Sequence, residues 1–181
     1  MLLQQYKIVF GGTMGAGKSA AINAISDIEV VCTEAVNTDS AGHEKALTTV
    51  GIDYGEICLD DGTKIGLYGT PGQNRFDFMW SIVCQGAIGT VVLIDHSQAN
   101  RIQDLEFYLQ SFEKYGQNIV IGITHLDEYH DQKLKIYHDW MRLHQKKYPI
   151  FAVDARKKED ILLMLETLMV SFEVLAELET V

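Results

Sequence analysis

The chain has 181 residues, and its 15 Lys plus Arg against 25 Asp plus Glu give a formal net charge of −10. With 47% hydrophobic and 22% charged residues, it has the composition of a globular protein with a sizeable core, which excludes a disordered or fibrous chain. The acidic balance argues against general binding to nucleic acid or anionic lipid, because both need clustered Lys and Arg. We therefore expect one domain over residues 1–181, in which local geometry holds any anionic ligand.

The first predicted element is a buried strand over residues 6–10, which are apolar and partly β-branched. A glycine-rich segment, 11–19, follows it directly, and the helix-forming residues 20–25 come next. The glycines therefore lie in a turn between a strand and a helix. Residues 26–49 are polar and weakly periodic, and a loop of that length indicates a function.

A hairpin and two buried strands are expected next. Residues 50–59 and 63–68 alternate as strands do, and Asp60-Asp61-Gly62 between them is a turn sequence. The continuous apolar runs 89–95 and 118–124 are typical of parallel strands that helices cover on both faces. These four segments place an antiparallel pair before the parallel part of a sheet.

The remaining segments complete an α/β pattern. A last strand is expected over 148–153, and helices are expected around 102–112, with Gly116 as a C-cap, over 132–146 and along an apolar face from Ile161 to Leu175. Strands that alternate with helices after an initial hairpin predict a six-stranded, mostly parallel, doubly wound sheet with one antiparallel edge strand.

The glycine-rich turn matches the P-loop pattern of nucleoside triphosphatases, Gly12-x4-Gly17-Lys18-Ser19, in the strand-turn-helix context that this pattern requires. Its backbone N–H groups would surround a phosphate at the positive end of the following helix. Lys18 would bridge the β- and γ-phosphates, and the Ser19 hydroxyl would bind Mg²⁺. The predicted phosphate-binding residues are Gly12, Thr13, Met14, Gly15, Ala16, Gly17, Lys18, Ser19 and Ala20.

Downstream segments resemble those of the Ras-like small GTPases. Thr49 closes the long polar loop before a strand and resembles the switch threonine, which implies that it completes the coordination of Mg²⁺ and acts in catalysis. Residues 69–76 (GTPGQNRF) resemble the second switch, which implies that the Gly72 amide touches the γ-phosphate and that Gln73 orients water. The family usually has Asp where this chain has Gly69. Bacterial MglA-like relatives, close to the Arf type, share that loss, so a bacterial member of this kind is expected.

The resemblance continues at the strand ends that would surround the base. Thr124-His125-Leu126-Asp127 stands where the family has Asn-Lys-x-Asp, which implies that Asp127 accepts two hydrogen bonds from guanine. Thr124 makes fewer hydrogen bonds than Asn, and the His125 ring would stack where a Lys stem lies, so the base selectivity is expected to be softer. Residues 153–156 (VDAR) resemble the Ser-Ala-Lys loop, which implies that the Ala155 amide meets guanine O6.

These resemblances imply a GTP/GDP switch that hydrolyses GTP with Mg²⁺. Residues 26–49 contain no Arg, so the chain lacks a cis arginine there, and Met14 would crowd the γ-phosphate. We therefore expect slow turnover that a GTPase-activating or effector protein stimulates. By resemblance to MglA-like proteins, a Roadblock-type dimer is the leading candidate for this partner. A nonhydrolysing GTP-binding scaffold and, more remotely, an ATP-using P-loop kinase remain alternatives.

Structural interpretations also stay open for single residues. The strand propensity of threonine also explains Thr49 at the start of a strand. A loop aspartate that caps the next segment is the alternative for Asp127. Asp95 either replaces the missing carboxylate at the metal or, as we favour, makes structural hydrogen bonds.

Location follows from the cysteines and the two ends of the chain. Three widely spaced cysteines predict small buried hydrophobic residues in a reducing cytoplasm. Leu2 and the end Glu179-Thr180-Val181 predict no myristoyl or prenyl anchor.

Overall fold

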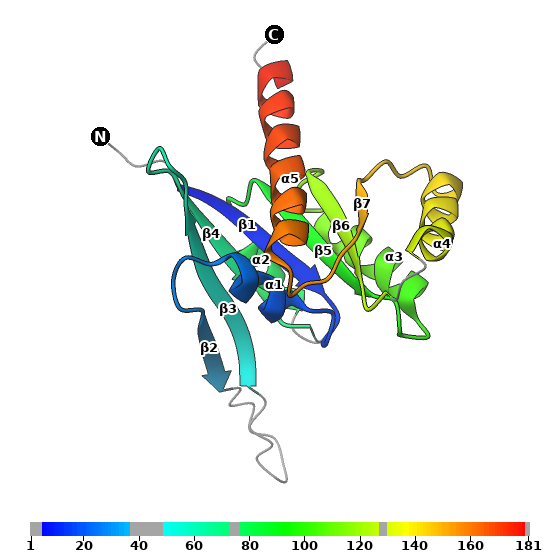
Figure 1. Ribbon diagram of the computed structural model, residues 1–181, viewed down its shortest axis with the longest axis horizontal. Coiled ribbons are helices and arrows are strands. Elements are labelled where there is room, and N and C mark those ends of the chain that lie inside the picture. Colours follow the sequence, from blue (N-terminus) through cyan, green and yellow to red (C-terminus); the bar gives the residue numbers. More distant parts are fainter. Residues whose placement is uncertain (1–4, 37–48, 73–76, 127–129, 180–181) are drawn as a thin grey trace.

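A central β-sheet with helices on both faces forms the body of the protein (Figure 1). The computed structural model describes residues 5–36, 49–72, 77–126 and 130–179. The strands are β1 (Gln5–Gly12), β2 (Val31–Val36), β3 (Thr49–Cys58), β4 (Lys64–Gly69), β5 (Gly89–Asp95), β6 (Ile119–Thr124) and β7 (Ile150–Ala152). The helices are α1 (Lys18–Ile25), α2 (Asp77–Val83), α3 (Arg101–Phe112), α4 (His130–Leu143) and α5 (Lys158–Glu179).

The sheet confirms the predicted α/β class, with a mostly parallel body and antiparallel pairing toward one edge. Its strand order is β2-β3-β4-β1-β5-β6-β7, and β3 runs antiparallel to both of its neighbours. The described residues form seven strands where six were expected, because Val31–Val36 pairs with β3 instead of belonging to a loop. The backbone groups of β3 that would otherwise face solvent supply this extra strand with hydrogen-bonding partners.

The predicted hairpin is present as β3 and β4. Its turn is closed by hydrogen bonds between the main chains of Leu59 and Thr63 (2.8 Å) and of Gly62 and Leu59 (2.9 Å). This turn sets the register of the two strands, in which Asp53 lies directly opposite Gly69. A side chain on one of these two positions is therefore the nearest cross-strand neighbour of the other.

Alternate side chains of the central strands enter two separate cores. On β1, Ile8 and Phe10 belong to the core under α1 and α5, whereas Val9 belongs to the core under α2, α3 and α4. This alternation follows from the two-residue period of a strand, and it is why the inner strands are apolar throughout. The sheet therefore holds the ends of β1, β5 and β6 rigidly side by side.

The end of one helix differs from the expectation. Helix α3 ends at Phe112 with Glu113 as its C-cap in right-handed conformation, so the predicted cap at Gly116 is wrong. Main-chain hydrogen bonds from Glu113 to Leu109 (2.9 Å) and from Tyr115 to Phe112 (2.9 Å) end the helix without a left-handed glycine.

Within the described residues, no helix is both long and apolar enough to cross a membrane.

Candidate nucleotide site

The predicted P-loop curls tightly between β1 and α1. Gly12, Gly15 and Gly17 all have positive φ, at 137°, 85° and 99°. Residues with a Cβ rarely adopt such angles, and a Cβ on Gly12 would lie 2.2 Å from the carbonyl oxygen of Leu93. The glycine spacing of the motif is therefore required by this turn.

Lys18 and Ser19 stand at the first turn of α1, next to the loop. The Lys18 amine donates hydrogen bonds to the main-chain oxygens of Gly12 and Thr13, both at 2.7 Å, and its side chain is only 8% exposed. Burial lowers the pKa of Lys18 to about 8, although the negative charge of Asp53 acts in the opposite direction. Thr13 Oγ1 is buried and has no hydrogen-bond partner among the described residues. The loop therefore presents a buried cation and an unpaired hydroxyl.

Asp53 is a site residue that the sequence did not suggest. It lies on β3, and its Oδ2 accepts a hydrogen bond from the Ser19 hydroxyl. It also lies opposite Gly69, the position at which the resemblance expects an acidic side chain. The signal in the sequence was the hairpin register, because the turn after Leu59 already pairs residue 53 with residue 69.

The second-switch segment approaches the P-loop at Gly72. A Cβ on Gly72 would lie 2.5 Å from the Met14 nitrogen and 2.9 Å from Lys18 Nζ. The Tyr108 hydroxyl donates a hydrogen bond of 3.3 Å to the Gly72 carbonyl oxygen. Gly72 is therefore in position to meet a terminal phosphate held by the loop, while Gln73 lies outside the described residues.

Thr49 begins β3 and pairs with Val36 of β2. Asp53 is four residues further along the same strand, or about 13 Å at the usual strand rise. The role of Thr49 in catalysis and metal binding stays a prediction.

The end of β6 forms the opposite wall of the site. The Thr124 hydroxyl contacts the main-chain oxygens of Ala16 (3.0 Å) and Ile94 (3.3 Å), so it fastens β6 to the P-loop. The His125 Nδ1 atom lies 3.0 Å from Thr124 Oγ1 and 3.2 Å from Asp95 Oδ1. Asp127, the predicted base reader, lies outside the described residues.

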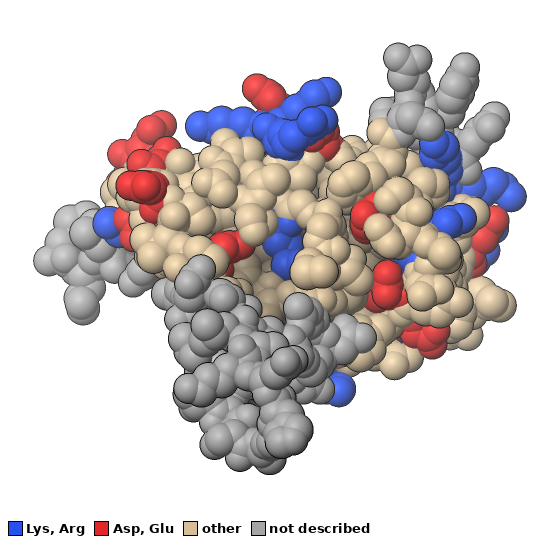
Figure 2. Space-filling model, turned by 90° about the horizontal axis from the view of Figure 1, so that it is seen from below, with Lys and Arg blue, Asp and Glu red and all other residues tan. Residues whose placement is uncertain are grey.

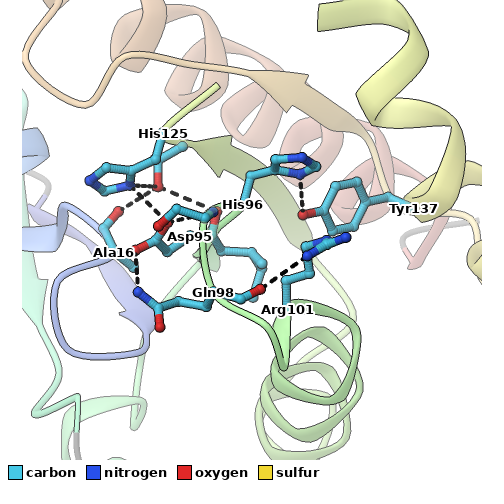
Figure 3. Close-up of polar contacts among 10 residues, drawn as sticks. Ala16, Asp95, His96, Gln98, Arg101, His125 and Tyr137 are labelled. Atoms are coloured by element: carbon cyan, nitrogen blue, oxygen red, sulfur yellow. Dashed lines mark hydrogen bonds and ion pairs between the residues drawn. The ribbon is translucent and has the colours of Figure 1, made fainter. Parts of the chain in front are cut away.

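Asp95 has the structural role that we favoured over metal binding. Figure 3 shows its side chain between His125 and Gln98. Its carboxylate accepts hydrogen bonds from the Ser97 nitrogen (2.9 Å), the Ser97 hydroxyl (2.6 Å) and the Gln98 amide (3.0 Å). Burial would raise the pKa of Asp95, but these hydrogen bonds and His125 lower it overall. Its oxygens are thus committed to holding the turn after β5.

The loop after β7 meets the P-loop through Ala155, and the predicted contact of its amide with a base stays a prediction. A Cβ on Gly17 would lie 2.7 Å from the Ala155 Cβ. Arg156 forms hydrogen bonds with both carboxylate oxygens of Asp154, at 2.9 and 2.7 Å, and this holds the pKa of Asp154 well below its usual range. The Asp160 carboxylate accepts a hydrogen bond of 2.8 Å from the Asp154 nitrogen and ties the loop to α5. The loop is therefore held in place without a ligand.

Two pockets meet at the P-loop. One, of about 580 Å³, lies between the P-loop, His125 and Ala155, and the other, of about 460 Å³, lies between the P-loop, Asp53 and Gly72. Both are lined by Gly15, Gly17 and Ala20, so the two pockets lie next to each other along the P-loop, and together they are called the groove below. Seen from below, the molecule is hollowed, with basic atoms recessed in the hollow (Figure 2).

The residues beside the P-loop fit a magnesium ion by their chemistry. Ser19 supplies a hydroxyl oxygen and Asp53 a carboxylate oxygen, and Mg²⁺ binds hard oxygen ligands. In the described part of the chain, no group of three or more His, Cys, Asp or Glu side chains could hold a metal ion. Any magnesium here would therefore need phosphate oxygens as further ligands, as is usual for nucleotide-bound Mg²⁺.

A family model described as "Conserved hypothetical ATP binding protein" matches residues 29–180. The chain belongs to this ATP-binding family. The family match begins after the P-loop. It includes Asp53, the second-switch segment, and the loops at His125 and Ala155 that line the pocket of about 580 Å³. A relative from Methanocaldococcus jannaschii, an uncharacterized protein, is 33% identical over 126 residues, which are 68% of this chain and 73% of the relative.

Two GTP-binding or Ras-related proteins are also similar to this member of the ATP-binding family. The GTP-binding protein YPT1 of Saccharomyces cerevisiae is 24% identical over 121 residues, which cover 65% of this chain. The Ras-related protein RABD2a of Arabidopsis thaliana is 25% identical over 118 residues, which cover 64% of it. The matched regions are 53% and 52% of those two proteins, so the chain spans about half of their length.

Solved structures show the same fold. The G domain of the FeoB iron transporter of T. maritima has a TM-score of 0.65 at 18% identity, covering 94% of this chain and 99% of that domain. The bacterial selenocysteine-specific elongation factor EF-Sec also has a TM-score of 0.65, at 16% identity, covering 93% of this chain and 29% of its own. The chain therefore has the fold of a G domain.

Proposed function

We propose that the chain binds a guanine nucleotide with Mg²⁺ and hydrolyses GTP to GDP and phosphate as a molecular switch. The observation that carries this proposal is the pair of adjacent pockets along the P-loop. Its two parts share Gly15, Gly17 and Ala20, with His125 and Ala155 on one side and Lys18, Ser19 and Gly72 on the other. A nucleotide has its base and its phosphates at opposite ends, and these two sides suit them.

The phosphate side suits charge stabilisation during hydrolysis. The Ser19 hydroxyl would help to hold Mg²⁺, which would neutralise negative charge on the phosphates. The Lys18 amine is buried, so its interaction with a phosphate would be only weakly screened by water. The Gly72 amide would meet the γ-phosphate, and Gln73 would orient the attacking water. The Thr49 hydroxyl would complete the coordination of Mg²⁺ when a γ-phosphate is bound.

Two candidates for the base of the nucleotide have support. Asp127, by the family resemblance, favours guanine, as do the similar proteins YPT1 and RABD2a. The description of the matching family favours ATP. Thr124 is already hydrogen-bonded to Ala16, which leaves the Thr124 and His125 corner with fewer groups for the base than Asn and Lys would offer. ATP binding is therefore the second candidate function.

Turnover is proposed to be slow without a protein partner. Among the described residues that line the phosphate pocket, Lys18 is the cation and no arginine is present. An arginine supplied to this reaction raises the rate by about 10³ to 10⁵. Met14, whose side chain is 73% exposed, sits at the mouth of the same pocket and would crowd the γ-phosphate. A Roadblock-type dimer is the partner that the resemblance to MglA-like proteins suggests.

Competition between the two nucleotides tests the base. Purified chain is titrated with fluorescent GTP, and unlabelled ATP and GTP compete for it. We expect GTP to compete at least about tenfold better, and Asp127→Asn to remove that preference. Asp60→Asn, which removes one charge at the far hairpin turn, is the matched control. Better competition by ATP would instead establish the second candidate.

Phosphate release tests the reaction itself. Single-turnover hydrolysis of bound GTP should be slow, and Gln73→Leu should slow it further without weakening GTP binding. Tight GTP binding with no phosphate release in the wild type would replace the switch with a nonhydrolysing scaffold. Transfer of the γ-phosphate to a small acceptor, in place of water, would indicate a kinase.

A further inference from the structure

We propose that Asp53 supplies the carboxylate of the magnesium site, from β3, in place of the acidic residue missing at Gly69. The inference rests on the proposed nucleotide binding and adds a residue to it. It concerns a position on a different strand from the one in which Ras-like proteins carry their acidic residue.

The register of the hairpin makes this replacement geometrically possible. Asp53 and Gly69 are directly opposite each other on antiparallel neighbours β3 and β4. Side chains at such positions are nearest cross-strand neighbours on the same face of the sheet, so a carboxylate from either position reaches nearly the same space. Compared with the family pattern, the acidic residue is thus on the neighbouring strand, at the position paired with residue 69.

Side chains at both positions would crowd each other. A Cβ built on Gly69 would lie 3.2 Å from both the Cβ and the Oδ2 of Asp53, and 3.1 Å from Ile22 Cδ1. These distances are tight before any carboxylate is added at position 69. Glycine at 69 is therefore what leaves room for the Asp53 side chain in its observed orientation.

Asp53 points to the atom at which magnesium is expected. Its Oδ2 accepts a hydrogen bond from the Ser19 hydroxyl, whose oxygen is predicted to bind Mg²⁺. Both residues line the pocket of about 460 Å³ that also contains Lys18 and Gly72. A cation bound there would take oxygen atoms from Ser19, Asp53 or its bound water, and the phosphates.

Nucleotide retention at varied Mg²⁺ tests the assignment without measuring hydrolysis. Protein loaded with fluorescent GDP or GTP is diluted into unlabelled nucleotide, and the release rate is followed from chelator to saturating Mg²⁺. We expect Asp53→Asn to raise the Mg²⁺ concentration for half-maximal retention by about 10- to 100-fold. With chelator present, its release rate should equal that of the wild type or be slower, because one negative charge near the phosphates is gone.

Matched variants separate a metal role from a structural one. Asp53→Asn keeps an oxygen that can accept the Ser19 hydrogen bond, so its thermal unfolding without nucleotide should match that of Asp60→Asn. The exchange variant Asp53→Gly/Gly69→Asp returns the carboxylate to β4 and should restore the Mg²⁺ midpoint to within about threefold of the wild type. Gly69→Asp alone, with two crowded carboxylates, should not show normal retention.

Bound Mn²⁺, counted by electron paramagnetic resonance of the nucleotide complex, gives a second readout. We expect the wild type and the exchange variant to retain the ion and Asp53→Asn to lose most of it at the same free Mn²⁺. An unchanged Mg²⁺ midpoint and unchanged Mn²⁺ binding in Asp53→Asn would overturn this assignment alone. A wild-type chain that binds neither GTP nor ATP would overturn both this assignment and the proposed function.

Discussion

The hydroxyl of Thr124, at the end of β6, lies 3.0 Å from the carbonyl oxygen of Ala16 in the P-loop, 108 residues away in sequence. This contact is buried and joins the two sides of the groove. It means that the residue expected to face the base also supports the loop expected to hold the phosphates. Loss of the hydroxyl should therefore affect both ends of a bound nucleotide.

Thr124→Val should test this coupling. The variant leaves a buried carbonyl oxygen without its partner, which costs about 1–3 kcal/mol in the free energy of unfolding. Nucleotide affinity should fall by about tenfold, the factor that corresponds to 1.4 kcal/mol. Urea denaturation and nucleotide titration measure the two effects. Thr167→Val removes an exposed hydroxyl that donates to Leu163 on α5, and it should change neither quantity. Equal behaviour of the two variants would contradict the coupling.

Gly72→Ala should separate the triphosphate from the diphosphate. Its new Cβ would lie 2.5 Å from the Met14 nitrogen, so the second-switch segment must move away from the P-loop. Loss of one hydrogen bond to a charged phosphate should reduce the preference for triphosphate over diphosphate by about 10- to 100-fold. Competition binding measures this ratio. Gly116→Ala is the matched control, since nothing lies within 4 Å of its Cβ. An unaltered ratio in Gly72→Ala would show that this glycine does not meet the γ-phosphate.

Cysteine alkylation should report on occupation of the phosphate pocket. Cys32 and Cys58 are exposed and Cys84 is buried, so only the first two should react in the native protein. The expectation of three buried cysteines is thus wrong for two of them, which lie on the β2 and β3 side of the sheet. Cys32 lines the phosphate pocket, so Mg²⁺-nucleotide should slow its alkylation while Cys58 stays equally reactive. Mass spectrometry of each peptide distinguishes these outcomes, and equal protection of both cysteines would point to a general change in stability.

Alkaline pH should destabilise the protein partly through Cys84. Burial raises the pKa of its thiol from 9.0 to about 12, although the charge of Lys7 acts in the opposite direction. Since the folded pKa is above the unfolded one, this stabilisation is complete below about pH 9 and is lost as the pH rises toward 12. The loss is at most about 1.4 kcal/mol per pH unit in that window.

Urea denaturation between pH 8 and about pH 10.5 measures this loss. The unfolding free energy of Cys84→Ala should fall less steeply with pH than that of the wild type. Cys58→Ala, at an exposed position, should follow the wild-type slope. A Cys84→Ala slope equal to the wild-type slope would contradict the role of the buried thiol.

Much of the nucleotide site could be predicted from local patterns. The P-loop spacing from Gly12 to Ser19 identifies its own turn, because positive φ angles at three positions require glycine there. Thr124 and Ala155 were expected beside a base by family resemblance; the structure brings both against the P-loop, and their role toward a base stays a prediction. Gln73 and Asp127, which lie outside the described residues, stay predictions.

The strand β2 and the role of Asp53 could not be predicted in the same way. Val31–Val36 becomes a strand only because β3 has backbone groups to pair with, and that partner is remote from any local pattern. Asp53 looked like one polar residue in an alternating strand. The hairpin turn pairs it with Gly69, but its hydrogen bond with Ser19 from α1 arises only in the assembled fold.

The sequence by itself determined the class of fold and the phosphate-binding turn, since hydrophobic period and glycine spacing are local properties of the chain. The tertiary structure alone decided which side chains gather beside the P-loop. Hydrogen bonds such as Thr124 to Ala16 and Ser19 to Asp53 join residues from different elements. Such contacts arise from the pairing of strands and the packing of helices, and no pattern within a single segment encodes them.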